Sequence, residues 1–266
     1  MSIATKVSTT TLDPNEPGPI VDRYRALRLS WWPVLLFLPA RTVLSYVSEA
    51  IAACVFWLRG SSAPWQESTG WWMVYGTLTD LGCLGLLAWL TRRERLRIRE
   101  LLGLSRASLV RQLRSGFWYV LAFVPVIVAS SLVARLFYAD QMVPQVSAIH
   151  TPAWASFYSI AVWPIIWGFT EELVYLGYLL PRLQAWTGKA VLSVVIVVAM
   201  WGLQHSVIPF IADQRYQASR VLGALIVVGG MTAIFMLGRR RLISAMIVHY
   251  VADFGAAISA LVLPRR

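Results

Sequence analysis

Cysteine is almost absent from this sequence, and charged residues are scarce. Only two cysteines occur, Cys54 and Cys83, and both lie within apolar segments. We expect small buried side chains there, because two cysteines in this setting build neither a disulfide framework nor a metal cluster. Charged residues make up 14% of the chain and hydrophobic residues 58%, with a mean hydropathy of +0.61. A soluble domain with a solvated surface does not reach these values, so the composition predicts a polytopic membrane protein.

Internal repeats, low-complexity tracts and basic stripes interleaved with exposed aromatic residues are also missing. A transporter built from two similar halves therefore gains no support. The net charge of +11 would suggest nucleic acid in a soluble protein, but without such a stripe we expect no nucleic-acid partner. The first apolar run starts near Trp31, is too long for a signal peptide and lacks a small-residue cleavage site, so we expect no cleaved leader.

Long apolar runs occupy most of the chain and predict its fold class. The first two runs, at about 30–58 and 71–90, are each long enough for the roughly 20 residues that cross the hydrocarbon of a bilayer. We expect an all-α transmembrane bundle of about seven spans, at about 30–58, 71–90, 117–138, 153–183, 190–205, 221–237 and 242–262. The chain divides into a polar, proline-broken cytoplasmic tail (1–28), N-terminal spans with a basic connector (29–150) and a four-helix membrane core (151–266).

The most basic stretch, 92–114, follows the second span. Its apolar residues recur near helical spacing, which leaves two interpretations: an interfacial helix lying on anionic lipid, or a solvated connector that fixes topology. Most of the 24 lysines and arginines fall in this stretch, in the tail, at Arg182 and Lys189, or at 239–241. These segments share one side of the membrane if the N-terminus is cytoplasmic, and the positive-inside rule favours that orientation. Membrane lipids are expected partners.

Protonatable side chains inside the membrane gather in the last four spans. By insertion scales a charged side chain there costs about 2.5–3.5 kcal/mol, so its presence points to function. The group consists of Glu171, Glu172, His205, His249 and Asp253. Glu49 and Asp80 lie outside it, and we expect them to be structural or to line a cavity.

Helical spacing gives each polar group a neighbour, because residues four apart share one face. Three pairs fit: Glu171 with Tyr175, Trp201 with His205, and His249 with Asp253. Three helices that point such groups at one centre would form a wet cavity able to activate water for hydrolysis. A carboxylate there is suited to take a proton from water and pass it to a leaving amine, while an imidazole can face the oxygen that becomes negative.

The residues alone leave other interpretations open. The two glutamates could be structural contacts between helices, His205 could be a satisfied buried imidazole, and His249 with Asp253 could be an intrahelical pair. Intramembrane Glu and His also build the proton relays of proton-coupled carriers. Two histidines and a carboxylate can hold zinc with an open position for water, and the residues that would do so are Glu171, His205 and His249.

Three short motifs follow one another between about residues 155 and 255. They are Glu171-Glu172-x-x-x-Leu176, Trp201-x-x-x-His205 and His249-x-x-x-Asp253. They resemble the E-E-x-x-x-R, F-x-x-x-H and H-x-x-x-N or H-x-x-x-D patterns of the CPBP family of intramembrane proteases. That family includes type II CAAX prenyl endopeptidases and Abi-type bacteriocin self-immunity proteins. The order and separation of the three motifs make the resemblance more specific than any one of them.

The resemblance implies a role for each of these residues. Glu171 would act as general base and acid on water, with His205 assisting. His249 and Asp253 would bind the scissile carbonyl oxygen, and Glu172 would support Glu171. The chemistry implied is that of glutamate, with no required cofactor, although a divalent metal such as zinc is the alternative.

Leu176 departs from the family pattern, and Asp253 is a milder departure because the family allows aspartate there. Leu176 stands where the family has arginine, so Glu172 lacks the cation expected one turn away. Arg182 lies six residues after Leu176, about 240° further round a helix, and is therefore a poor substitute. Glu172 would then be protonated or paired with another residue. An ionised Asp253 would repel an oxyanion, so Asp253 is expected to be protonated or to orient His249 through a ring N–H.

The sequence therefore predicts an intramembrane endopeptidase of the CAAX-protease-like type. Its substrate would be a protein or peptide with a lipid-modified or membrane-embedded C-terminal segment. The alternative is a non-catalytic immunity or scaffold membrane protein of the same fold that binds a peptide partner, and Leu176 is the feature that favours it.

Overall fold

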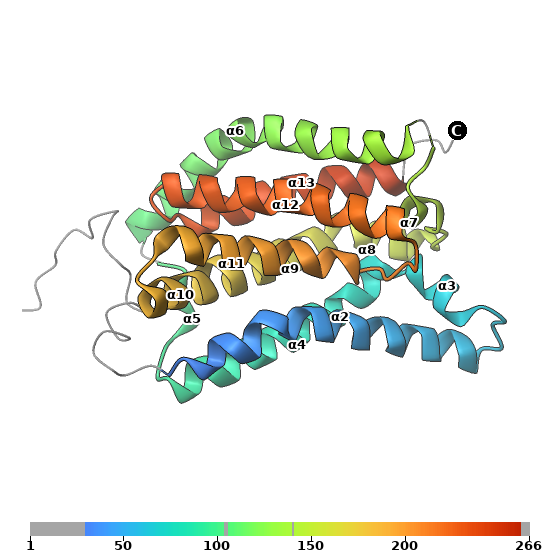
Figure 1. The fold of residues 1–266 in the computed structure, drawn as a ribbon, viewed down its shortest axis with the longest axis horizontal. Coiled ribbons are helices and arrows are strands. Elements are labelled where there is room, and N and C mark those ends of the chain that lie inside the picture. The colour runs from blue at the N-terminus through green and yellow to red at the C-terminus, as the bar shows by residue number, and fades with distance from the viewer. Residues whose placement is uncertain (1–29, 104–105, 140, 262–266) are drawn as a thin grey trace, which may run out of the picture.

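The computed structural model describes residues 30–103, 106–139 and 141–261, and every regular element in this part is helical (Figure 1). The predicted all-α fold is confirmed. In chain order the elements are α2 (Trp32–Leu58), α3 (Pro64–Thr69), α4 (Trp72–Arg93), α5 (Ile98–Leu101), α6 (Arg106–Tyr138), α7 (Pro144–Ser147), α8 (Ala153–Ala161), α9 (Trp163–Glu172), the π-helix η1 (Leu173–Leu179), α10 (Leu180–Thr187), α11 (Ala190–Leu203), the 3-10 turn η2 (Gln204–Ser206), α12 (Gln214–Leu237) and α13 (Leu242–Leu261).

Among the described residues, five helices are long and apolar enough to cross a membrane: α2, α4, α6, α12 and α13. Only 6% of the most apolar window of α6 is buried inside the protein, so this helix faces lipid over most of its surface. The chain is an integral membrane protein. The other two predicted spans take a different form, because α11 is a shorter apolar helix and the segment from α8 to α10 is interrupted. Seven crossings remain a prediction.

The segment that carries the glutamate pair is irregular. Pro164 lies in the first turn of α9, where its missing N–H is not needed. Directly after Glu172 the helix widens into η1, and the Leu180 N–H donates to the Tyr175 carbonyl five residues back. Pro181 follows in the next turn, and it lacks the N–H that a regular α-helix would use there. Such π turns are frequent at functional sites, and this one starts at the residue after the pair.

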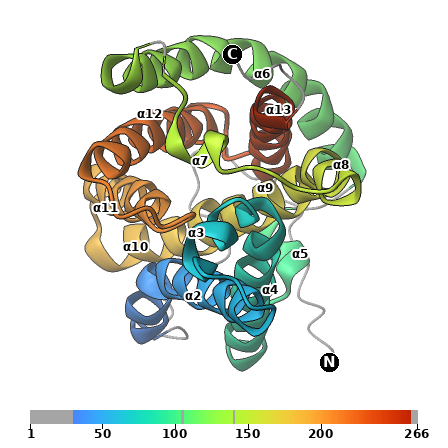
Figure 2. The same ribbon diagram turned by 90° about the vertical axis from the view of Figure 1, so that its right-hand side faces the viewer.

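The view along the bundle axis shows α9 near its centre (Figure 2). Helices α2 and α4 lie on one side of it, α11 and α12 on another, and α6 forms the outer layer next to α13. α9 packs directly against both α4 and α13. The helix that carries the glutamate pair therefore contacts the N-terminal and the C-terminal parts of the chain.

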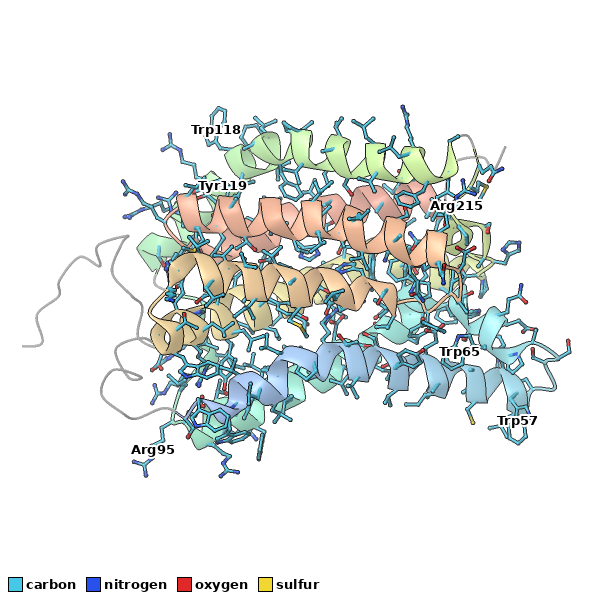
Figure 3. The ribbon with its side chains drawn as sticks, in the orientation of Figure 1. Trp57, Trp65, Arg95, Trp118, Tyr119 and Arg215 are labelled. Carbon is cyan, nitrogen blue, oxygen red and sulfur yellow. The ribbon has the colours of Figure 1, made fainter. Side chains whose placement is uncertain are left out.

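The basic stretch after the second span forms a connector and the start of a span. α4 ends at Arg93, α5 has only four residues, and α6 begins at Arg106. The second half of this stretch therefore continues as the first turns of α6, and contact of the remainder with lipid stays a prediction. Arg95 lies at one end of the bundle, and Arg215 lies near the other (Figure 3). The predicted tail, 1–28, lies outside the described residues, and a cytoplasmic N-terminus stays a prediction.

Candidate active site

Glu171 lies fully buried in the last turn of α9, and hydrogen-bond donors surround its carboxylate. Oε1 accepts from Arg41 Nε at 2.9 Å and from Gln204 Nε2 at 2.6 Å. Oε2 accepts from the indole N–H of Trp201 at 2.6 Å. Hydrogen bonds to a charged acceptor are the strong ones, so this arrangement holds an ionised carboxylate in one orientation inside the bundle.

Arg41 supplies the cation of this cluster from α2, far from the three motifs in sequence. Its side chain is 1% exposed and also pairs with the buried carboxylate of Asp80 on α4. The guanidinium lies 4.4 Å from the centroid of the Trp167 ring. Sequence reasoning assigned Arg41 no role in the site. A signal was present, because an arginine inside a membrane span is expected to pair with an acid.

Trp201 and Gln204 are held in place by Tyr175, the residue predicted to share a face with Glu171. The rings of Tyr175 and Trp201 are stacked, with centroids 4.9 Å apart and an interplanar angle of 11°. The Tyr175 hydroxyl donates to Gln204 Oε1 at 2.7 Å. Gln204 must therefore turn its amide nitrogen toward Glu171, and the orientation of its side chain is fixed at both ends. Sequence reasoning missed Gln204, although a polar residue beside His205 in an apolar run was the available signal.

His205 approaches Glu171 without touching it. Its Nδ1 lies 3.0 Å from the backbone carbonyl oxygen of Trp201, and no ring nitrogen lies within the 4.0 Å of a Glu171 oxygen that would mark an ion pair between these described residues. A carbonyl can only accept, so Nδ1 carries the hydrogen in that contact and a neutral imidazole keeps the lone pair of Nε2. Trp201 thus orients both groups, one through its indole N–H and the other through its carbonyl.

His249 lies among three carboxylates. Its Nδ1 is 3.1 Å from Glu172 Oε1, and its Nε2 is 3.7 Å from Glu171 Oε2 and 3.4 Å from Asp253 Oδ2. His249 is therefore the partner of Glu172 that the motif left open. Leu176, at the arginine position, is buried in the apolar core. The contact to Asp253 is not aligned as a hydrogen bond, and Asp253 Oδ2 has no hydrogen-bond partner among the described residues.

The remaining charged residues near the core have partners of their own. Glu49 accepts from the Phe210 backbone N–H at 2.8 Å, which ties α2 to the loop that follows His205. Arg182 pairs with Glu94, the residue that ends α4, and Tyr178 donates to the same carboxylate at 3.1 Å. Burial raises the pKa of Glu94, while Arg182 and Tyr178 oppose that shift.

A cavity of about 670 Å³ joins four of the five predicted site residues. Glu171, His205, His249 and Asp253 all line it, whereas Glu172 lies behind His249 and does not. The other walls come from α6, α12 and α13 and are largely apolar, with residues such as Phe123, Ile127, Val227 and Met231. The structure therefore brings an acid, two imidazoles and a second acid to one pocket with largely apolar walls.

The donor set does not fit a metal ion. No three His, Cys, Asp or Glu side chains are grouped as metal ligands in the part of the chain that the structure describes. Both Glu171 oxygens already accept hydrogen bonds, and the Arg41 guanidinium would lie beside any bound cation.

A comparison with protein families matches residues 152–255 to the model described as type II CAAX prenyl endopeptidase Rce1-like. The match supports membership of this region, called the CPBP region below, in the CPBP family. A search of curated proteins gave no significant match, and neither did a search of solved structures. The CPBP region holds all three motifs, and the family as a whole points to a CAAX-protease-like enzyme. Arg41 and Asp80, which complete the buried cluster, lie outside the CPBP region.

Proposed function

We propose that this protein is an intramembrane endopeptidase that hydrolyses a peptide bond with water activated at Glu171. The single observation that carries the proposal is the cavity shared by Glu171, His205, His249 and Asp253. Membership of the CPBP region in a family of CAAX-type proteases supports it. Positioned groups of this kind take a proton from the nucleophile and return it to the leaving group.

Glu171 is proposed as the general base. Because His205 does not contact Glu171 directly, cooperation between the two would run through a water molecule that donates to both. Nε2 of His205 has the free lone pair for this contact. Arg41, Gln204 and Trp201 act as positioning residues, since they fix the carboxylate by donating hydrogen bonds to it.

His249 is proposed to stabilise the oxyanion. As the water oxygen bonds to the scissile carbonyl carbon, the carbonyl oxygen becomes negative, and an N–H aimed at it stabilises the intermediate. Glu172 accepts from His249 Nδ1 and so favours a protonated ring whose Nε2–H faces the cavity. Asp253, 3.4 Å from that nitrogen, would orient the ring. Collapse of the intermediate breaks the C–N bond, and Glu171 passes its proton to the amine.

The apolar walls support a substrate that brings hydrophobic material with it. Helices α6, α12 and α13 surround the cavity with aliphatic side chains, and such a surface suits a lipid chain or a membrane-embedded peptide. We propose a protein or peptide with a lipid-modified C-terminal segment as the substrate class. Membrane lipids are the other expected partners.

Replacing Glu171 by glutamine tests the proposal. In the Glu171→Gln variant Arg41 still pairs with Asp80, so the buried cluster keeps one cation and one anion and the protein is expected to fold. We expect cleavage of a fluorogenic S-farnesyl peptide to fall at least about a hundredfold, the usual size of a general-base contribution. Glu67→Gln, at an exposed glutamate on α3, is the matched control.

Cleavage that persists in the Glu171→Gln protein would remove the glutamate mechanism. A cellular phenotype that persists in this variant would favour the alternative, a non-catalytic immunity or scaffold protein that binds a peptide partner. Flux of a solute across proteoliposomes, with no cleaved fragment, would instead indicate a carrier.

A further inference from the structure

A second cavity, of about 390 Å³, adjoins the first. Three tryptophans form its walls, Trp72 on α4 with Trp163 and Trp167 on α9. It shares lining residues with the first cavity, among them His205, Arg220 and Asp253. The two cavities therefore meet at these shared residues.

Two of the tryptophans present hydrogen-bond donors without acceptors. Trp163 is 2% exposed and Trp72 is 7% exposed, yet neither indole N–H meets an acceptor among the described residues. Their rings meet edge to face with centroids 5.0 Å apart. A buried N–H without a partner is destabilising, and two of them beside one cavity call for a ligand that accepts hydrogen bonds.

Arg220 adds a positive charge to this chamber. It lies on α12, a candidate membrane span, and its Nη2 donates to the Ile208 carbonyl at 3.1 Å. Its Nε is buried without an acceptor, and Arg220 makes no ion pair with any described acid. The guanidinium carbon lies 5.9 Å from the Trp72 ring centroid. Arg41 and Arg182, by contrast, each pair with a carboxylate.

We propose that the aromatic chamber is a subsite for the C-terminal carboxylate of the peptide substrate, with Arg220 as its cation. This inference rests on the proposed function, because it places the end of the peptide relative to the hydrolysed bond. The guanidinium of Arg220 matches the two oxygens of a carboxylate, and the indole N–H groups of Trp72 and Trp163 add donors. The enzyme would therefore release a short C-terminal fragment.

Binding of matched peptides tests the subsite without requiring cleavage. The full chain carrying Glu171→Gln is placed in phosphatidylcholine nanodiscs, and a labelled S-farnesyl-cysteine peptide with three further residues is titrated by fluorescence anisotropy. The free-acid peptide is expected to bind roughly tenfold or more tightly than its C-terminal amide, as hydrogen bonds to a charged group imply. Arg220→Gln should abolish the difference, and Trp163→Phe should reduce it.

Arg215→Gln is the matched control, because Arg215 is an exposed arginine on the same helix that packs over Tyr138. It should leave the difference between acid and amide unchanged. The proposal is overturned if the two peptides bind equally, if neither binds, or if their difference survives Arg220→Gln. It is also overturned if phosphatidylglycerol in the nanodisc removes the difference, because the occupant would then be a lipid headgroup.

The two proposals fail in different ways. If the unmodified protein cleaves acid and amide peptides equally, hydrolysis at Glu171 stands and the carboxylate subsite falls. If binding depends on Arg220 and the acid but no fragment appears, the subsite stands and hydrolysis falls.

Discussion

The two halves of the bundle contribute different kinds of side chain to the buried cluster around Glu171. The C-terminal region, 152–255, supplies the acids and imidazoles that carry the proposed chemistry. The N-terminal helices α2 and α4 supply Arg41 and Asp80, which set the charge around them. The boundary of the family match is therefore not the boundary of the site. The residues of the proposed chemistry lie in one half, and the buried cation that pairs with Glu171 comes from the other.

Removing the cation of the N-terminal half should have the largest effect on stability. Arg41→Met leaves Glu171 and Asp80 buried with no guanidinium between them, and breaking a buried ion pair in this way costs about 3–5 kcal/mol. We expect a large loss of thermal stability in detergent, measured as thermal unfolding by intrinsic tryptophan fluorescence.

A second substitution shows whether charge is the cause. Adding Asp80→Asn to Arg41→Met removes one of the two anions and should recover part of the lost stability. Arg182→Met, which breaks the pair with Glu94 at the end of α4, should cost less because Glu94 keeps some exposure. Equal losses for Arg41→Met and Arg182→Met would contradict a special role for the cluster at Glu171.

Restoring the family arginine is expected to harm the protein. Leu176 lies in η1, is 1% exposed and packs in the apolar core. Glu172 already has a hydrogen-bond partner in His249. Leu176→Arg would bury a guanidinium without a partner, so stability should fall by several kcal/mol with no gain in peptide cleavage. Leu176→Met is the control, because it keeps the volume and polarity of the side chain. Higher activity at unchanged stability would show that the introduced guanidinium reaches Glu172.

Sequence patterns predicted the elements of the site well where local spacing decides geometry. The i,i+4 rule correctly placed Tyr175 on the side of Glu171, where its ring stacks on Trp201. Apolar run lengths predicted the long helices, since a span must match the hydrocarbon thickness. The ends were less accurate: α6 starts at Arg106, about ten residues before the predicted span, because a helix can extend beyond the apolar run it contains.

Contacts between side chains on different helices could not be predicted from sequence spacing. The pairing of Glu171 with Arg41 joins residues 130 positions apart, and nothing in either local pattern specifies which helices become neighbours. The π-helix after Glu172 also changes which side chains share a face, because a wider turn breaks the i,i+4 register. Glu172 itself lies in α9, and the packing of α9 against α13 places it beside His249, a partner the motif did not name.

A weaker pH effect should distinguish the pair of Arg182 with Glu94 from the cluster at Arg41. Burial holds the pKa of Glu94 above its ordinary value of 4.5, so the folded protein binds this proton more tightly than the unfolded chain. The stability that Glu94 contributes is then present at low pH and is lost as the pH rises through the folded-state pKa. The difference in melting temperature between the unmodified protein and Glu94→Gln should therefore become less favourable to the unmodified protein as the pH rises above about 4.5. A rising difference would mean that Arg182 outweighs burial.

The smallest effect is expected from metal removal. If Arg41 neutralises Glu171, the site needs no second cation, and the three donors on its carboxylate leave little room for one. Peptide cleavage should therefore be unchanged after dialysis against EDTA or incubation with 1,10-phenanthroline. Addition of zinc to the treated protein is the matched control. A loss of activity that zinc restores would mean that Glu171, His205 and His249 gather around a metal during turnover. The C-terminal half would then supply its own cation, and Arg41 would be a structural partner of Asp80 alone.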